Sequence, residues 1–375
     1  MPCAIQLTHS ACVGGFCYDV KEHGKMTPSA ENTKELFLRA CQFEPTDRVP
    51  VWIMRQAGRY LPEYQAVRAH HSFLDICKTP ELAAEVSIQP HRVLGVDAVI
   101  VFSDILIVAE AMGMPLDVPD SGPVLGNPVR DVSAVRSLRD FDPSRETKFV
   151  GDAIRAICKQ VGPTVPVIGF AAAPWTLACY MIEGRTRGDI SIAKQMLRED
   201  PKLVRELLER IARATAGYLK MQIDAGATAV QLFDTWAGEL SQEDYDAVEL
   251  PATRQVLQAL GGENVPKILY AKGSAQHLES MAKSGANVLS VDWNIDLAEA
   301  RRKLGRRVAL QGNVDPSKLL GPVEEIRRAA REAIEKTGGA GHILNLGHGI
   351  LPNTPVEHAR AFVEAGKAAM VAART

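Results

Sequence analysis

The chain has 375 residues, of which 43 are basic and 45 acidic, and a formal net charge of −2 at pH 7. A balance this close to zero, without any basic run, argues against a broad nucleic-acid-binding surface. No stretch of about 18 consecutive apolar residues occurs, so we expect no membrane-spanning helix and no membrane partner.

The first thirty residues differ in character from the rest of the chain. They lack the apolar run of a signal peptide and the Arg- and Ser-rich composition of a transit peptide. We expect residues 1–30 to be a disordered extension and residues 31–375 to form the folded domain. The seven cysteines are odd in number and form no Cys-x-x-Cys, which is typical of free thiols in a reducing compartment. Cytoplasm is therefore the expected location, with a plastid as the alternative.

A helix over residues 33–41 precedes the first predicted strand, residues 51–54. That strand runs directly into Arg55-Gln56-Ala57-Gly58-Arg59. Arginine keeps its charge in proteins, and its planar guanidinium forms two parallel hydrogen bonds with a carboxylate. Two arginines at the end of a core strand indicate an anion-binding loop. A solvated surface loop is the alternative that these residues alone leave open.

Strands and helices then alternate along the chain. Continuous apolar runs between helices are typical of a parallel sheet buried on both faces. Residues 112–131 are rich in Pro and Gly and have no period, so we expect an insert or lid there. Strands are predicted at residues 51–54, 98–102, 165–170, 229–233, 267–270, 288–291, 308–310 and 343–346. Further helices are predicted at about residues 79–94, 145–160, 175–180, 200–225, 275–283, 296–303, 322–336 and 355–375.

Three of these units share one pattern, in which a helix-ending glycine precedes an apolar strand and a carboxylate ends it. They run over residues 95–104, 226–234 and 285–292. Eight strand–helix units predict an α/β fold, a single (β/α)8 TIM-type barrel, whose active site lies at the carboxyl ends of the strands. A doubly wound open sheet is the alternative, because periodicity does not show closure. That fold normally carries a Gly-rich nucleotide loop, and we find none.

A closed barrel would gather a set of polar residues at its mouth. We expect Asp104 and His348 to serve function rather than a helix cap or a core contact, and Lys272 to be solvated or ion-paired. The chain has no His-Glu-x-x-His, His-x-Cys or Gly-x-Ser-x-Gly, which weakens metal hydrolysis, zinc-dependent methyl transfer and acyl transfer. The residues expected at the mouth are Arg55, Arg59, Ser103, Asp104, Thr235, Lys272, Asp292, Asn313 and His348.

Six motifs in order make this chain resemble the uroporphyrinogen decarboxylase family. The most specific is Met-Arg-Gln-Ala-Gly-Arg-Tyr-Leu-Pro at residues 54–62. The others lie at residues 102–104, 169–176, 180–184, 310–313 and 345–349. The resemblance covers roughly residues 33–370.

The resemblance implies a homodimeric (β/α)8 barrel and a carboxy-lyase that needs neither cofactor nor metal. It implies removal of four acetate carboxylates from uroporphyrinogen III as CO2, leaving coproporphyrinogen III, in haem and chlorophyll biosynthesis. The family's substrate-binding set falls on Arg55, Gln56, Ala57, Gly58, Arg59, Asp104, Tyr180, Thr235 and His348. Position 235 is often Ser in the family, so the methyl group of Thr235 changes the local fit.

The implied chemistry gives these residues roles. Protonating the pyrrole carbon that bears the acetate creates an electron sink within the substrate, so no separate cofactor is required. Asp104 would stabilise the cationic pyrrole, and Arg55 and Arg59 would bind carboxylates. The proton donor stays open between Arg55, His348 and a water relay. Two rival functions are a zinc-dependent methyltransferase acting on a corrinoid or thiol, and a non-catalytic tetrapyrrole carrier.

Overall fold

A computed structural model describes residues 31–371 apart from 120–121, 186–187 and 274, with three short backbone segments before residue 31. Those segments are β1 (Ala11–Val13), β2 (Phe16–Asp19) and β3 (Thr27–Pro28), which pair antiparallel. The prediction of a disordered extension over residues 1–30 falls largely outside the described residues.

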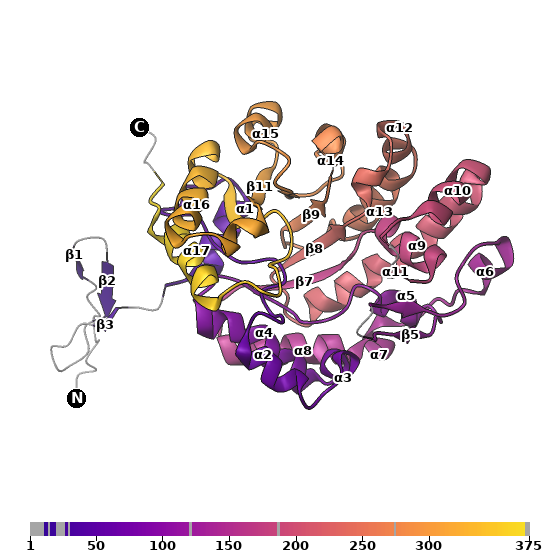
Figure 1. The fold of residues 1–375 in the computed structure, drawn as a ribbon, viewed down its shortest axis with the longest axis horizontal. Coiled ribbons are helices and arrows are strands. Elements are labelled where there is room, and N and C mark those ends of the chain that lie inside the picture. The colour runs from indigo at the N-terminus through magenta and orange to yellow at the C-terminus, as the bar shows by residue number, and fades with distance from the viewer. Residues whose placement is uncertain are drawn as a thin grey trace, which may run out of the picture.

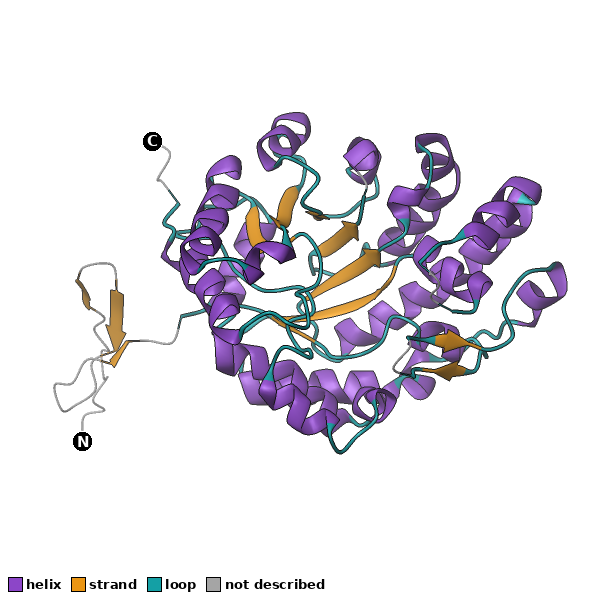
Figure 2. Cartoon of the chain, viewed as in Figure 1, coloured by secondary structure: helices purple, strands orange, loops and turns teal. Residues whose placement is uncertain are grey.

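The centre of the fold is a seven-stranded sheet in the order β12-β11-β10-β9-β8-β7-β4, in which every neighbouring pair is parallel. The sheet curves, and helices line its outer side (Figures 1 and 2). The predicted alternation of parallel strands and helices is thereby confirmed. The strands are β4 (Val99–Ile100), β7 (Val167–Ala172), β8 (Ala229–Asp234), β9 (Lys267–Ala271), β10 (Val288–Val291), β11 (Ala309–Val314) and β12 (His342–Leu346).

The helices that cover the sheet start and stop at the residues that local chemistry favours. Asp200 caps one helix by accepting a hydrogen bond from Leu203 N at 3.0 Å, and Gly95 ends another at φ 70°. The helices in the first half are α1 (Thr33–Cys41), α2 (Pro62–Arg68), α3 (Phe73–Lys78), α4 (Pro80–Leu94), α5 (Ile107–Ala111), α6 (Val132–Ser137), α7 (Pro143–Glu146), α8 (Lys148–Val161) and α9 (Pro174–Glu183).

The second half of the chain contains the longest helix, α11 (Pro201–Asp224). The other helices there are α10 (Ser191–Glu199), α12 (Gln242–Asp244), α13 (Leu250–Ala259), α14 (Leu278–Met281), α15 (Leu297–Leu304), α16 (Val323–Thr337) and α17 (Val356–Ala368), with a π-helical turn η2 (Tyr245–Glu249) before α13. Short 3-10 turns are η1 (Ala237–Glu239), η3 (Ala275–His277) and η4 (Pro316–Leu320). None of the helices in the described ranges has the length and apolarity needed to cross a membrane.

The segment predicted as a strand at residues 51–54 is not a regular strand. Val51 forms a parallel bridge with Leu344 of β12 on one side, and its carbonyl accepts from Asp97 N at 2.8 Å on the other. Trp52 N also donates to Leu344 O at 3.3 Å, while side chains accept from other N–H groups of the segment. Met54 N donates to Asn345 Oδ1 at 2.8 Å, and Val51 N donates to Asp97 Oδ2 at 2.8 Å. The segment therefore lies between β12 and the start of β4, held by side-chain as well as backbone hydrogen bonds.

A buried charge cluster fixes this segment. Asp97 is fully buried and receives two hydrogen bonds from the Arg48 guanidinium, at 2.7 and 2.9 Å. Lys367 of α17 forms an ion pair with the same carboxylate at 3.0 Å. Since Asp97 also accepts from Val51 N, one carboxylate ties three parts of the chain together.

The insert predicted at residues 112–131 contains a small antiparallel pair, β5 (Leu116–Asp117) and β6 (Val124–Leu125). Sequence periodicity missed several short helices, among them α2, α3, α5 and α6, because they are too short to show a full hydrophobic period. The capping box of Ser72 and Asp75 at the start of α3 was the available signal.

Candidate active site

The loop after residue 54 begins with an unusual backbone conformation at Arg55, whose φ is 61°. The fully buried Gln56 holds the loop in place. Its side chain accepts from Ile53 N at 3.2 Å and donates to Ala98 O at 3.0 Å, while its carbonyl accepts from the Tyr60 hydroxyl at 2.8 Å. The side chain of Gln56 thus bonds only to the backbone of the fold. Arg55 and Arg59, before and after it in the loop, are exposed.

The rest of this loop is suited to an anion. Within the described residues, the backbone N–H groups of Ala57, Gly58 and Arg59 donate no hydrogen bond. Ala57 and Gly58 are half-buried. Three consecutive unused donors between two guanidinium groups are a favourable setting for carboxylate oxygens.

Arg55 reaches toward the loop that follows β12. A Cβ placed on Gly349 would lie 2.2 Å from Arg55 Cδ and 2.7 Å from its Cγ. The aliphatic part of Arg55 therefore packs directly on the Gly349 backbone, which any larger residue would prevent. This contact brings the arginine beside His348.

Asp104 follows β4 and lies within range of the positive charge of Arg55. One carboxylate oxygen accepts from Leu106 N at 2.7 Å, and in the part of the chain that the structure describes the other accepts no hydrogen bond. Burial raises the pKa of Asp104 to about 6, with Glu110 adding to the rise, while the Leu106 N–H and Arg55 oppose it. At pH 7 the group is therefore mainly a carboxylate with one oxygen available to a ligand.

His348 lies at the carboxyl end of β12 and is half-buried. Its ring stacks on Tyr270 with centroids 6.0 Å apart and planes 10° apart, and Nδ1 lies 2.9 Å from the Tyr270 hydroxyl. Burial, together with the charges of Arg55 and Lys272, lowers the pKa of His348 to about 4. The ring is neutral at pH 7, so it would meet a ligand as a hydrogen-bonding group and not as a cation.

The structure thus brings Arg55, Asp104 and His348 together from three segments far apart in sequence. The remaining expected site residues lie on other segments. Tyr180 is on α9 and Thr235 directly follows β8, and both are half-buried. Arg59 is exposed, with Tyr64 within range of its charge.

Other polar residues expected at the mouth organise loops. Asp292 accepts from Gly273 N at 2.5 Å and from Asn294 N at 3.1 Å. Asn313 donates to the carbonyls of Asp292 and Ile295, at 2.8 and 2.6 Å. Lys272 is exposed. No three His, Cys, Asp or Glu side chains of the described residues are placed to share a metal ion.

Sequence reasoning missed Tyr270, which holds His348. It lies inside the apolar run of β9, where a tyrosine reads as ordinary core, and only its contact with a residue 78 positions later reveals its role. Such a contact leaves no local signal.

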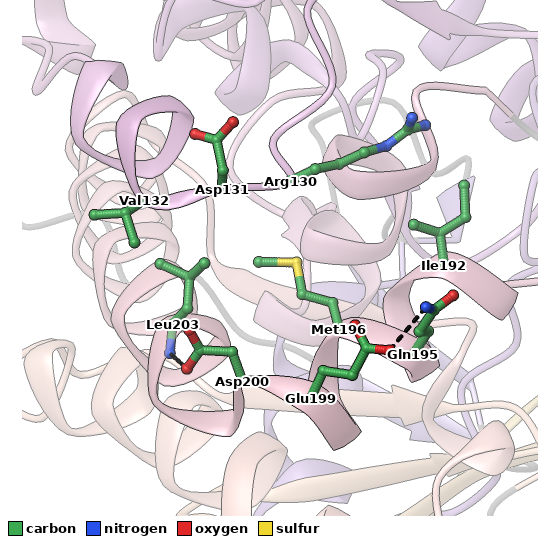
Figure 3. Close-up of a pocket in the computed structure, with 9 residues that line it drawn as sticks. All are labelled: Arg130, Asp131, Val132, Ile192, Gln195, Met196, Glu199, Asp200 and Leu203. Atoms are coloured by element: carbon green, nitrogen blue, oxygen red, sulfur yellow. Dashed lines mark hydrogen bonds between the residues drawn. The ribbon is translucent and has the colours of Figure 1, made fainter.

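A pocket of about 380 Å³ lies elsewhere, beside α10 and the start of α11 (Figure 3). None of the expected site residues lines it. Its Arg130 is engaged with the carbonyls of Ile182 and Glu183, at 3.0 and 3.3 Å. The lining residues are Arg130, Asp131, Val132, Ile192, Gln195, Met196, Glu199, Asp200 and Leu203.

Comparison with solved structures places the fold among known α/β enzymes. The chain is similar to a methyltransferase from Methanosarcina mazei, with 25% identity and a TM-score of 0.75 over 90% of this chain and 99% of the other. It also shares the fold of a B12-independent methionine synthase from Shewanella, at 13% identity and a TM-score of 0.53 over 86% and 96% of the two chains.

Comparison with protein sequences is more specific. Residues 32–369 match the family described as uroporphyrinogen decarboxylase (URO-D). A protein named uroporphyrinogen decarboxylase from Geobacter metallireducens is 48% identical over 88% of this chain and 96% of its own length. Another of that name, from Gloeobacter violaceus, is 45% identical over 91% of this chain and 100% of its own length. The chain belongs to the uroporphyrinogen decarboxylase family.

Proposed function

We propose that this protein converts uroporphyrinogen III to coproporphyrinogen III by removing its four acetate carboxylates as CO2. The observation that carries the proposal is the convergence of Arg55, the ionised Asp104 and the neutral His348 at the carboxyl edge of the parallel sheet. The family match and the names of the relatives support the same activity.

The fold we propose for the folded domain is a single closed (β/α)8 barrel. The 51–54 segment would be its eighth strand position, since Val51 bridges β12 and accepts from Asp97 just before β4. Packing of α17, which follows β12, against α4, which precedes β4, supports closure on the outer layer. A closed barrel would place the loops after all eight strands around one mouth.

Substrate binding in this proposal rests on charge. Uroporphyrinogen carries eight carboxylates, and Arg55, Arg59 and the unused N–H groups of residues 57–59 would bind some of them. Each guanidinium can hold a carboxylate with two parallel hydrogen bonds. Tyr180, Thr235 and His348 would add polar contacts to the side arms. Because His348 is neutral, it would orient the substrate through a hydrogen bond and would not attract it by charge.

Decarboxylation itself would centre on Asp104. A proton added to the pyrrole carbon that bears an acetate makes the ring cationic, and the electron pair of the breaking C–C bond flows into that ring as CO2 leaves. Protonation of the remaining methylene then gives a methyl group, and the ring carbon loses the proton added in the first step, which restores the neutral pyrrole. Each cycle therefore consumes one proton overall. The free oxygen of Asp104 would accept from the pyrrole N–H groups and stabilise the cation. A preorganised contact of this type is typically worth about 3–4 kcal/mol.

We further propose that the protein is a cytoplasmic homodimer, as the resemblance implies. Size-exclusion chromatography with light scattering would measure the dimer directly. A monomer at assay concentrations, with full turnover, would contradict that part of the proposal.

The activity is tested by anaerobic incubation with chemically reduced uroporphyrinogen III, followed by oxidation and separation by carboxylate number. Products with seven to four carboxylates, formed without added metal or cofactor, would establish the decarboxylase. Stoichiometric binding of unchanged substrate would instead support a tetrapyrrole carrier. Absence of binding, together with stoichiometric zinc in the purified protein, would favour the methyl-transfer chemistry named for the Methanosarcina protein.

A further inference from the structure

A pair of buried carboxyl groups lies behind the candidate active site. Asp234 is the last residue of β8, Glu249 ends η2, and both side chains are fully buried. The two carboxyl groups lie close enough to interact directly, and each shifts the pKa of the other. No cation of the described residues pairs with either of them. The decarboxylation chemistry above uses neither group.

Each member of the pair holds the start of helix α9. The Thr176 hydroxyl donates to Asp234 Oδ1 at 2.7 Å, and Trp175 N donates to Glu249 Oε2 at 2.8 Å. The Thr253 hydroxyl of α13 donates to the other oxygen of Glu249. The pair therefore joins the end of β8, the first turn of α9 and helix α13.

Two touching carboxyl groups without a cation cannot both be ionised. Asp234 Oδ2 is buried, and no N–H or hydroxyl of the described residues donates to it. A proton carried between the two carboxyl groups would satisfy it. Burial raises the pKa of Asp234, and burial together with the charge of Asp234 raises the pKa of Glu249.

Two of the titratable groups near the pair stay neutral, and the other two have partners elsewhere. Cys179 of α9 and Tyr245 of η2 both face the two carboxyl groups, and burial, reinforced by those carboxyl groups, raises the pKa of each well above its ordinary value. Glu183, at the end of α9, is occupied by a hydrogen bond from Ala193 N at 3.0 Å. Lys194, whose charge acts on Cys179, is paired with Glu239 at 2.6 Å.

We propose that Asp234 and Glu249 share one proton and act as a positioning pair, which fixes Tyr180 and Thr235 relative to each other. Thr235 directly follows Asp234. Tyr180 lies one helical turn after Thr176, on the same face of α9. The roles of Tyr180 and Thr235 as substrate contacts rest on the proposed function, whereas the shared proton does not.

Three variants separate these points. Asp234→Asn keeps the oxygen that accepts from Thr176 and places an amide donor where the shared proton lies. It therefore retains the hydrogen bond between Thr176 and residue 234, here called the clamp, without a titrating proton. Thr176→Val removes the hydroxyl at nearly constant volume and breaks the clamp. Asp140→Asn is the matched control, because the Asp140 side chain is 94% exposed.

The first readout needs no substrate. At pH 8, where Asp104 is ionised, infrared spectra of the wild type should contain the carbonyl band of a protonated carboxylic acid. Asp234→Asn should lose this band and Asp140→Asn should keep it. The melting temperature of the wild type should fall as alkaline pH removes the shared proton, and Asp234→Asn should flatten that fall. A band unchanged in Asp234→Asn would overturn the shared proton.

The second readout is kinetic. Thr176→Val removes two hydrogen bonds, the one to Asp234 and the one from Trp236 N. It should raise the KM for uroporphyrinogen III by roughly tenfold, with a smaller change in kcat. Asp234→Asn should stay close to the wild-type KM. An unchanged KM in folded Thr176→Val would overturn the positioning role. A wild type without turnover would count against the proposed function, while the infrared result would still decide the shared proton.

Discussion

The Tyr270 hydroxyl lies 2.9 Å from Nδ1 of His348 and 3.1 Å from the carbonyl oxygen of Gly347. The two rings are also nearly parallel, with planes 10° apart. This one residue of β9 therefore sets both the position and the rotation of the histidine ring. Because the ring is neutral, it would contact a ligand through a hydrogen bond of its other nitrogen, Nε2. The direction of that hydrogen bond depends on the rotation of the ring.

Replacing Tyr270 by Phe tests this relationship. The variant keeps the stacked ring and loses the hydroxyl, so the histidine is no longer held at Nδ1. We expect kcat/KM to fall roughly fivefold, the value of about one buried hydrogen bond. Steady-state kinetics with a thermal melt as a check on folding measures the change. Unaltered kinetics in the folded variant would show that His348 needs no such support.

The packing of Arg55 on Gly349 gives a second prediction. Gly349→Ala places a methyl group 2.2 Å from Arg55 Cδ, so the Arg55 side chain must leave its present position. We expect KM to rise on the order of tenfold through loss of one charged contact. Gly262→Ala is the matched control, because a Cβ there meets nothing within 4 Å. Equal kinetics for the two variants would contradict the role of Arg55.

The pH dependence of turnover should report Asp104. Its pKa is raised to about 6, chiefly by burial, so the catalytically useful carboxylate forms as pH rises through 6. We therefore expect kcat/KM to increase across that range. The contribution of Asp104 to the free energy of unfolding should change in the opposite direction. The neutral carboxyl group stabilises the fold, and this contribution is lost as pH rises through the same value. A kcat/KM profile whose acid limb lies near pH 4, the ordinary range of an aspartate, would contradict the assignment.

The buried cluster around Asp97 gives a prediction about folding. Asp97→Asn removes the buried carboxylate partner of Arg48, which keeps its ion pair with Glu31 at 2.7 Å. The free energy of unfolding should therefore fall by about 3 kcal/mol, the lower end for breaking a buried pair. Lys367→Met removes a pair whose lysine side chain is 33% exposed, so its cost should stay below about 1 kcal/mol. Denaturant unfolding of both variants measures the difference. Comparable losses would show that the cluster does not act through Arg48 and Asp97.

The sequence predicted the parts of this molecule that depend on local pattern. Gly95, Gly226 and Gly285 were expected to end helices, and all three have positive φ. Asp104 and Asp292 were expected to end strands. They follow β4 and β10, at the edge of the sheet where the carboxyl ends of the parallel strands meet. The hydrophobic period of an element and the residues that end it are properties of short stretches, so they can be recognised in a single sequence.

The parts that could not be predicted depend on contacts between distant residues. Residues 51–54 were predicted as a strand because they are apolar. Three of their four N–H groups nevertheless donate to side chains, among them Asn345, 291 positions later. Asp234 matched the strand-ending pattern, but its partner Glu249 sits in a helical turn where an acid reads as surface. Only the fold shows that both are buried.

The central claim is that Asp104 stabilises charge that develops during decarboxylation. The most direct measurement is the turnover of Asp104→Asn with uroporphyrinogen III under anaerobic conditions, compared with the wild type at equal folded concentration. We predict that kcat falls about 100- to 1,000-fold while KM changes little, because the arginines still bind the substrate. Near wild-type turnover of the variant would contradict the claim.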